Sequence, residues 1–133
     1  MNASRILVVD DEADIRRLLQ EILSEEGHDV DVAADAVEAR AARARAAPDL
    51  VLLDIWMPDT DGITLLREWS SDARNDCPVV MMSGHGTVET AVEATRLGAF
   101  DFIEKPLSLA KLLPTVKRAL DARRRRQAGS YAP

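Results

Sequence analysis

Short apolar runs recur along the chain, and each is followed by a segment with the apolar spacing of a helix. The runs lie at Ile6–Val9, Val30–Ala33, Leu50–Leu53, Val79–Met82 and Phe100–Ile103. The first, third and fourth are continuously apolar, which is typical of strands buried on both faces of a parallel sheet. The second and fifth are mixed, which favours peripheral strands. This alternation predicts a parallel sheet with helices on both faces and right-handed connections.

The five predicted strands and their short links indicate an α/β fold, a flavodoxin-like (βα)5 three-layer sandwich with strand order 2-1-3-4-5. The apolar face of the first helix comprises Ile15, Leu18, Leu19, Ile22 and Leu23. The fourth helix, which we expect Thr87 to cap, has as its inward residues Val88, Ala91, Val92 and Thr95. Pro114 lies inside the last helical pattern, so it either kinks that helix or marks its start.

Chemically distinctive residues follow four of the predicted strands, at the sheet edge where such folds bind ligands. They are Asp10, Asp11 and Glu12 after the first strand, Asp54 after the third, Ser83 after the fourth, and Lys105 with Pro106 after the fifth. Carboxylates gathered together repel one another unless a cation lies among them. Mg2+ prefers oxygen ligands, and a lysine ammonium or a serine hydroxyl suits a phosphoryl oxygen. This edge therefore predicts a cation and phosphoryl site, although Asp10 and Asp11 also suit helix capping.

Four motifs at these strand ends carry a family resemblance: VVDD, LLDIWMPDTDG, MMSGHG and DFIEKP. Together they resemble the response-regulator receiver domain of two-component signalling, over roughly residues 4–120. The stretch SGHGTVETAVEATRLGAFDFIEKPLS is most similar to receivers of sigma-54-dependent activators of the nitrogen-regulation type. The resemblance implies a phosphorylation-controlled signalling switch, with a sensor histidine kinase as phosphoryl donor and an output that controls transcription.

The resemblance also implies residue roles. Asp54 is the expected phosphoacceptor, and the expected Mg2+ ligands are Asp11 and Asp54 directly, Asp10 through a water, and the backbone carbonyl of Trp56. Ser83 and Lys105 are expected to bind the phosphoryl oxygens, Phe102 to be the switch aromatic, and Pro106 to follow a cis peptide bond.

Three positions depart from the common family pattern or are unusual within it. Ser83 stands where many receivers have Thr, so the hydroxyl is kept but χ1 is less restricted. Phe102 lacks a tyrosine hydroxyl, which excludes a switch hydrogen bond from that ring. Trp56 is bulky, and we predict that its ring shields the acyl phosphate from water.

Charge divides the chain into two parts. Residues 1–110 carry a net charge of −12 and residues 111–133 carry +6, which together give −6. The acidic part argues against direct nucleic-acid binding, and Arg123 to Arg126 fit better as cations at a helix C-terminus than as a DNA patch. We expect a receiver domain at 1–122 and a basic tail, or the start of a linker to an output domain, at 123–133.

The same sequence predicts a cytoplasmic location, because it shows no membrane-spanning run and no signal peptide, and has one cysteine. It contains no phosphate-binding loop of the GxxxxGK[ST] kind, so these 133 residues do not include the ATPase module of sigma-54 activators and do not identify the output of the switch. A stand-alone receiver that acts through protein contacts is the alternative. The family often dimerises through the face of the fourth helix, fifth strand and fifth helix, which we expect here also.

Other functions of this fold fit less well. A dinucleotide-binding enzyme needs a glycine-rich turn after the first strand, where this chain has VVDDEAD. An aspartate-based phosphatase usually has a second Asp two residues after the nucleophile, where this chain has Trp56. A receiver-like domain that only binds partners predicts loss of the acid pair, the acceptor or the lysine, and all are present. We therefore expect no enzyme activity beyond the domain's own phosphoryl transfer and dephosphorylation.

Overall fold

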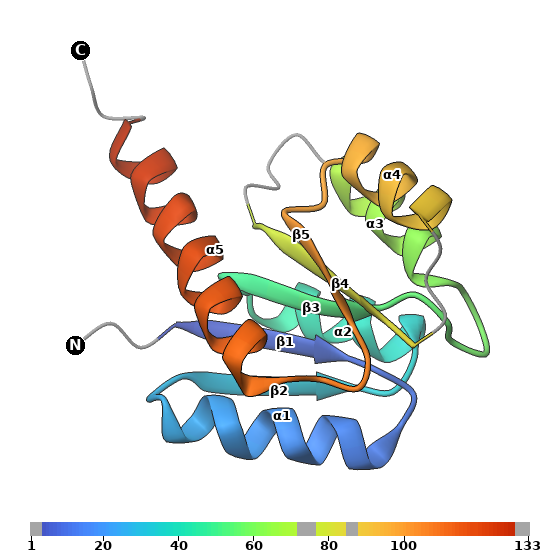
Figure 1. The fold of residues 1–133 in the computed structure, drawn as a ribbon, viewed down its shortest axis with the longest axis horizontal. Coiled ribbons are helices and arrows are strands. Elements are labelled where there is room, and N and C mark those ends of the chain that lie inside the picture. The colour runs from blue at the N-terminus through green and yellow to red at the C-terminus, as the bar shows by residue number, and fades with distance from the viewer. Residues whose placement is uncertain (1–3, 72–76, 85–87, 130–133) are drawn as a thin grey trace.

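The structure, a computed structural model, describes residues 4–71, 77–84 and 88–129. Strands and helices alternate along this part of the chain (Figure 1). The strands are β1 (Arg5–Val9), β2 (Asp29–Ala33), β3 (Leu50–Asp54), β4 (Val79–Ser83) and β5 (Asp101–Glu104). The helices are α1 (Ala13–Glu25), α2 (Ala36–Arg45), α3 (Gly62–Ser70), α4 (Val88–Arg96) and α5 (Leu109–Gly129).

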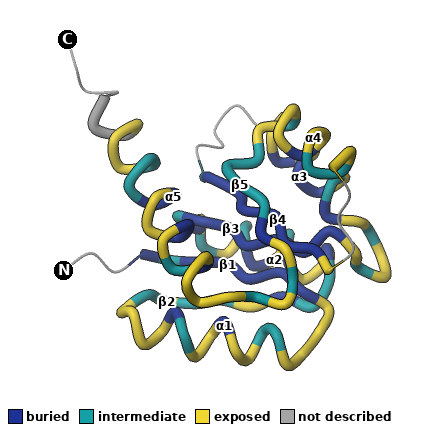
Figure 2. The backbone as a smooth tube through the Cα atoms, in the orientation of Figure 1, coloured by how far each residue is buried: buried dark blue, intermediate teal, exposed yellow. Residues whose placement is uncertain are grey.

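The strands form one parallel sheet in the order β2-β1-β3-β4-β5, which confirms the predicted fold. The mixed runs form the two edge strands, and the continuously apolar runs form the centre. Every residue of β3 and of β4 is buried, which follows from their position between helical layers (Figure 2). Among the described residues, no helix is both long enough and apolar enough to cross a membrane.

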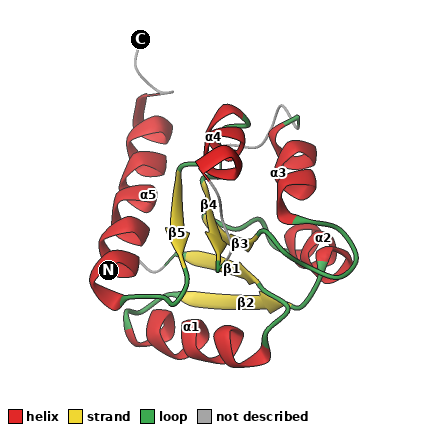
Figure 3. Ribbon diagram, turned by 45° about the vertical axis from the view of Figure 1, so that its right-hand side comes forward, coloured by secondary structure: helices red, strands yellow, loops and turns green. Residues whose placement is uncertain are grey.

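Two apolar cores lie on opposite faces of the sheet, and successive strand residues alternate between them. In β1, Leu7 and Val9 pack with the core formed by α2, α3 and α4, whereas Ile6 and Val8 pack with the core formed by α1 and α5. The three-layer arrangement is visible in Figure 3, where helices flank the strands on both sides. Leu18, expected on the inner face of α1, is 43% exposed and lies at the margin of that face.

The predicted inward face of α4 is wrong. Val88 is 81% exposed and Val92 is 45% exposed, whereas Ala94 is the buried residue of this helix. The predicted face instead lines a hollow of about 440 Å3 together with Phe102. The physical reason is position: α4 lies beside the edge strand β5, where there is less sheet for a helix to cover. Thr87, the expected cap, lies outside the described residues.

Helix α5 begins at Leu109 and continues through Pro114, so the proline does not mark its start. The carbonyl of Ser108 accepts the amides of Lys111 and Leu112, which closes the first turn. The helix also runs past residue 122, the expected domain boundary.

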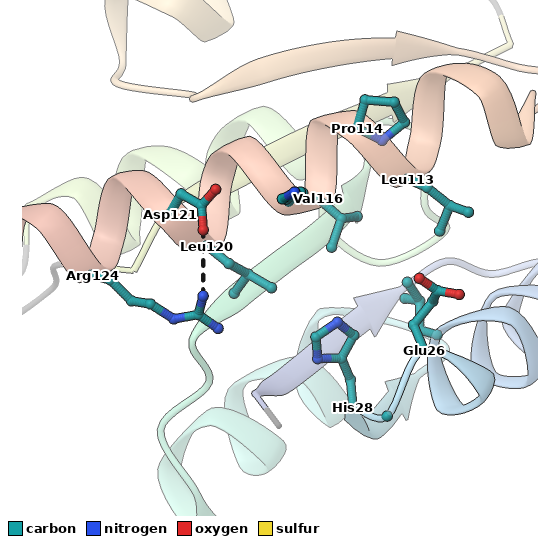
Figure 4. Close-up of a pocket in the computed structure, with 11 residues that line it drawn as sticks. Glu26, His28, Leu113, Pro114, Val116, Leu120, Asp121 and Arg124 are labelled. Atoms are coloured by element: carbon teal, nitrogen blue, oxygen red, sulfur yellow. Dashed lines mark hydrogen bonds and ion pairs between the residues drawn. The ribbon is translucent and has the colours of Figure 1, made fainter. Parts of the chain in front are cut away.

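The far end of α5 is attached to the body of the domain. Arg123 lies 2.7 Å from Oδ1 of Asp49, whose Oδ2 accepts the backbone N–H of Arg5. Close to this end, α5 and the end of α1 enclose a hollow of about 540 Å3, with Leu113 and Leu120 on one side (Figure 4). This hollow lies toward the ends of the strands opposite to the predicted site, because α1 starts at the carboxyl end of β1 and runs away from it.

Candidate functional site

Asp54 is the last residue of β3, and its side chain is 4% exposed. The four apolar residues before it are buried in the centre of the sheet, so the carboxylate is held at the sheet edge with little access to water. Burial raises the pKa of Asp54 to about 7, and the negative charge of Asp10 adds to this effect. Lys105 opposes the rise, because its positive charge favours the ionised carboxylate.

Asp10 follows β1 and is fully buried. Its backbone amide donates to the carbonyl of Ala33, and its Oδ1 accepts the amide of Glu12 at 2.9 Å. Asp11 and Glu12 are exposed, and carboxylate oxygens of the three acids lie within 4.8 Å of one another. The end of β1 therefore presents a cluster of hard oxygen donors, one from inside the domain and two from its surface.

Lys105 joins this cluster to Asp54. Its ammonium nitrogen lies 2.7 Å from Oδ2 of Asp10, 3.3 Å from Oε1 of Glu12 and 3.5 Å from Oδ1 of Asp54. Burial alone would lower the pKa of Lys105, but the hydrogen bond and charge of Asp10, with the charge of Asp54, hold the pKa above its ordinary value. The lysine is therefore a permanent cation among carboxylates, as the sequence predicts for this edge.

Ser83 ends β4 and is buried at the same edge of the sheet. Its carbonyl accepts the backbone amide of Lys105 at 2.9 Å, so the two residues are fixed side by side. The peptide bond between Lys105 and Pro106 is cis. Phe102, in the middle of β5, is half-buried and lines the hollow beside α4. The structure thus brings Asp10, Asp54, Ser83 and Lys105 together. Phe102 instead lines the hollow beside α4.

Trp56 and Glu12 are both exposed. Trp56, expected to supply a carbonyl ligand, is 53% exposed. Glu12 was given no individual role by the sequence, yet it contacts Lys105 across the site. The run of three acids after β1 indicates that Glu12 belongs to the site. Its contact with Lys105 could not be predicted, because it depends on where the fold places the end of β5.

The residues present fit a hard divalent cation. All the candidate side-chain donors are carboxylate oxygens, the ligands that Mg2+ prefers, and their mutual repulsion is a cost that a cation relieves. The buried Asp10 and Asp54 would hold such an ion from inside the domain, with the exposed Asp11 at the solvent side.

The fold and the site together define an α/β domain with a buried aspartate beside an acidic cluster and a lysine. Residues 6–117 match the family described as the response regulator receiver domain. The chain belongs to this family. Receiver domains bind Mg2+ at an acidic site, and this chain has an acidic cluster of Asp10, Asp11 and Glu12.

Individual relatives point to the same branch of the family. The chain is 45% identical over 127 residues to the nitrogen assimilation regulatory protein NtrX of Azorhizobium caulinodans, covering 94% of this chain and 28% of that protein. The receiver domain of NtrX from Brucella abortus has 52% sequence identity and a TM-score of 0.81, with 87% of this chain and 98% of that one covered. The beryllofluoride-activated NtrC4 receiver domain dimer has 39% identity and a TM-score of 0.83, with 90% and 98% covered.

The alignments cover 98% of each of the two receiver-domain structures, but only a part of the full-length regulators. The chain spans 28% of the length of the Azorhizobium NtrX that it matches. The comparisons therefore establish a receiver domain of the kind found in NtrX- and NtrC-type two-component regulators.

Proposed function

We propose that Asp54 accepts a phosphoryl group from a sensor histidine kinase, in a Mg2+-dependent reaction. In this step an oxygen of Asp54 forms a bond to phosphorus while the bond from phosphorus to the donor nitrogen breaks, and the electron pair leaves with the histidine. The observation that carries the proposal is the position of Lys105, which lies beside both Asp54 and the acid cluster.

Each residue has a role that its position supports. The proposed metal ligands are Asp11, Asp54 and the carbonyl of Trp56, with Asp10 holding a bound water. The ion supplies positive charge that neutralises the transferring phosphoryl group. Lys105 balances the charge on a second phosphoryl oxygen, and the Ser83 hydroxyl donates to a third. Since phosphoryl transfer needs mostly positioning and charge neutralisation, no further acid or base is required.

We propose that phosphorylation then repacks the face formed by α4, β5 and α5. Ser83 moves toward the phosphoryl group and leaves space into which Phe102 can turn from its half-buried position beside the hollow at α4. The phosphoryl group need only bind one of two existing conformations more tightly than the other. The exposed Val88 and Val92 on this face support its use as a dimer contact, and the NtrC4 relative is described as a receiver dimer.

We further propose that the receiver unit spans residues 1–122 and controls transcription through an output domain, without contacting nucleic acid itself. The resemblance to full-length regulators such as NtrX supports this assignment.

The switch is tested by NMR with beryllofluoride, a mimic of the phosphoryl group. Adding beryllofluoride and Mg2+ to the 15N-labelled protein is expected to shift the amide resonances of β5 and α4, and light scattering is expected to show a rise in mass. Asp54→Asn serves as the control, because it lacks the carboxylate that holds the mimic. Unchanged resonances in α4 and β5, alongside shifts at Asp54, would contradict the switch while leaving the acceptor role intact.

A further inference from the structure

Asp59 lies in the loop between β3 and α3, on the same segment as Asp54 and Trp56. Its carboxylate does not cap the helix that follows it, because Asp61 does so by accepting the amide of Thr64. Instead, Asp59 reaches across to the first turn of α2. The amide of Ala36 donates to both of its carboxylate oxygens at 3.2 and 3.1 Å, and the amide of Val37 donates to Oδ2 at 3.3 Å.

These bonds are additional to the cap that α2 makes from its own residues. Asp35, the N-cap residue, accepts the amide of Glu38 at 2.8 Å, and the side chain of Glu38 accepts the amide of Ala34 at 2.9 Å, one residue before the N-cap. This pair resembles a capping box. Helix α2 therefore has a local cap without Asp59. What Asp59 adds is a connection between the start of α2 and a loop distant in the sequence.

The hydrogen bonds of Asp59 complete a link between the two loops that carry the acidic site. The backbone amide of Asp10 donates to the carbonyl of Ala33, the last residue of β2. Asp59 binds α2 three residues later in the chain, at Ala36. The loop after β1 and the loop after β3 are thus hydrogen-bonded to the same short turn between β2 and α2. The amide of Ala36, followed by the amides of Thr60 and Val37, holds the pKa of Asp59 below its ordinary value, so the carboxylate is ionised at neutral pH.

We propose that Asp59 is a positioning residue, which holds the loop with Trp56 against the turn between β2 and α2 and so preorganises the acidic site for a divalent cation. This inference rests on the proposed function, because it concerns the same site. Asp59 itself binds neither the cation nor the phosphoryl group. Its effect passes through the backbone of residues 55–58, whose carbonyl at Trp56 is a proposed ligand.

The test compares Asp59→Ala with Asp35→Ala. Both variants remove one carboxylate from the N-terminus of α2, but only the first detaches the loop. Urea unfolding checks that both fold, and NMR titration of the 15N-labelled protein with MgCl2 gives the Mg2+ dissociation constant. We expect Asp59→Ala to raise this constant roughly tenfold, the lower end of the effect of groups that orient metal ligands. Asp35→Ala is expected to change it less than about twofold, because no metal-binding loop depends on it.

A second readout needs no metal. Amide hydrogen exchange of residues 55–61, measured in EDTA, is expected to accelerate in Asp59→Ala and to match the wild type in Asp35→Ala. Equal Mg2+ constants in the two variants, or unchanged exchange in Asp59→Ala, would overturn the inference. Failure of the proposed function would look different: the wild-type protein would bind Mg2+ and show the difference between the variants, yet Asp54 would take no phosphoryl group from a small phosphodonor.

Discussion

The side chains of Lys105 and Asp54 approach to 3.5 Å although β4 separates their strands in the sheet. The same ammonium nitrogen lies 2.7 Å from Asp10 and 3.3 Å from Glu12. One cation thus faces three carboxylates that come from two different strand ends, and two of these carboxylates are buried. The electrostatics of the site follow from this arrangement.

Replacing Lys105 by Met is expected to destabilise the metal-free protein, because it leaves buried carboxylates without their cation. The loss should be about 2–3 kcal/mol in urea unfolding at pH 7.5 in EDTA, below the usual 3–5 kcal/mol because the side chain of Lys105 is not fully buried. MgCl2 should restore part of the loss. Lys111→Met, at an exposed position of α5, is the matched control. Equal stability of the two variants in EDTA would show that the lysine does not balance the acid cluster.

Asp54 predicts a pH dependence of stability. Its pKa in the folded protein is about 7, above the ordinary value of 3.8, so the folded state binds the proton more tightly than the unfolded state. The contribution of Asp54 to stability is therefore complete below about pH 4 and is lost as the pH rises toward 7. At pH 8 in EDTA, Asp54→Asn should be more stable than the wild type by up to about 4 kcal/mol, since each tenfold change in the ionisation constant corresponds to about 1.4 kcal/mol.

The control for this prediction is the same pair of proteins at pH 4, where the difference should nearly disappear. A constant difference between pH 4 and pH 8 would show that ionisation of Asp54 is not its cause.

At Gly62 there is no room for a side chain, because this residue packs against the backbone of Asp54. A Cβ atom at this position would lie 2.2 Å from the backbone carbonyl oxygen of Asp54, and backbone cannot move aside as a flexible side chain can. Gly62→Ala is expected to lower the free energy of unfolding by more than about 3 kcal/mol. Gly84→Ala is the matched control, because its nearest contact would be an ordinary 3.8 Å to the side chain of Lys105. Similar unfolding midpoints for the two variants would refute the close approach.

Much of the fold could be predicted because its signals are local. Continuous apolar runs such as Val79–Met82 marked the central strands, and the residue after each run marked the site edge. The inward face of α4 could not be predicted, because the spacing of Val88 and Val92 shows that a helix has an apolar face but not whether a core or an open hollow lies opposite. The bond from Asp59 to α2 depends on which loops the fold brings together, and no local pattern reports that.

We expect Trp56 to slow the hydrolysis of the phosphoryl group on Asp54. Trp56 follows Asp54 by two residues and is exposed, and we expect its ring to limit the approach of water to phosphorylated Asp54. Trp56→Ala should therefore dephosphorylate about threefold faster, a change of under 1 kcal/mol in the barrier. Decay of the phosphorylated protein after removal of the donor measures this rate, and Trp56→Phe, which keeps a ring, should remain near the wild type. Equal decay rates for Trp56→Ala and the wild type would contradict the proposed shielding by the ring.

The central claim, that Asp54 accepts a phosphoryl group at a Mg2+ site, is tested most directly by mapping the modified residue. The protein is incubated with acetyl phosphate in MgCl2 or in EDTA, the acyl phosphate is reduced with borohydride, and the modified residue is located by tandem mass spectrometry. The account predicts modification at Asp54 in MgCl2 and almost none in EDTA. Modification at another residue, or labelling of Asp54 to the same extent in EDTA, would contradict it.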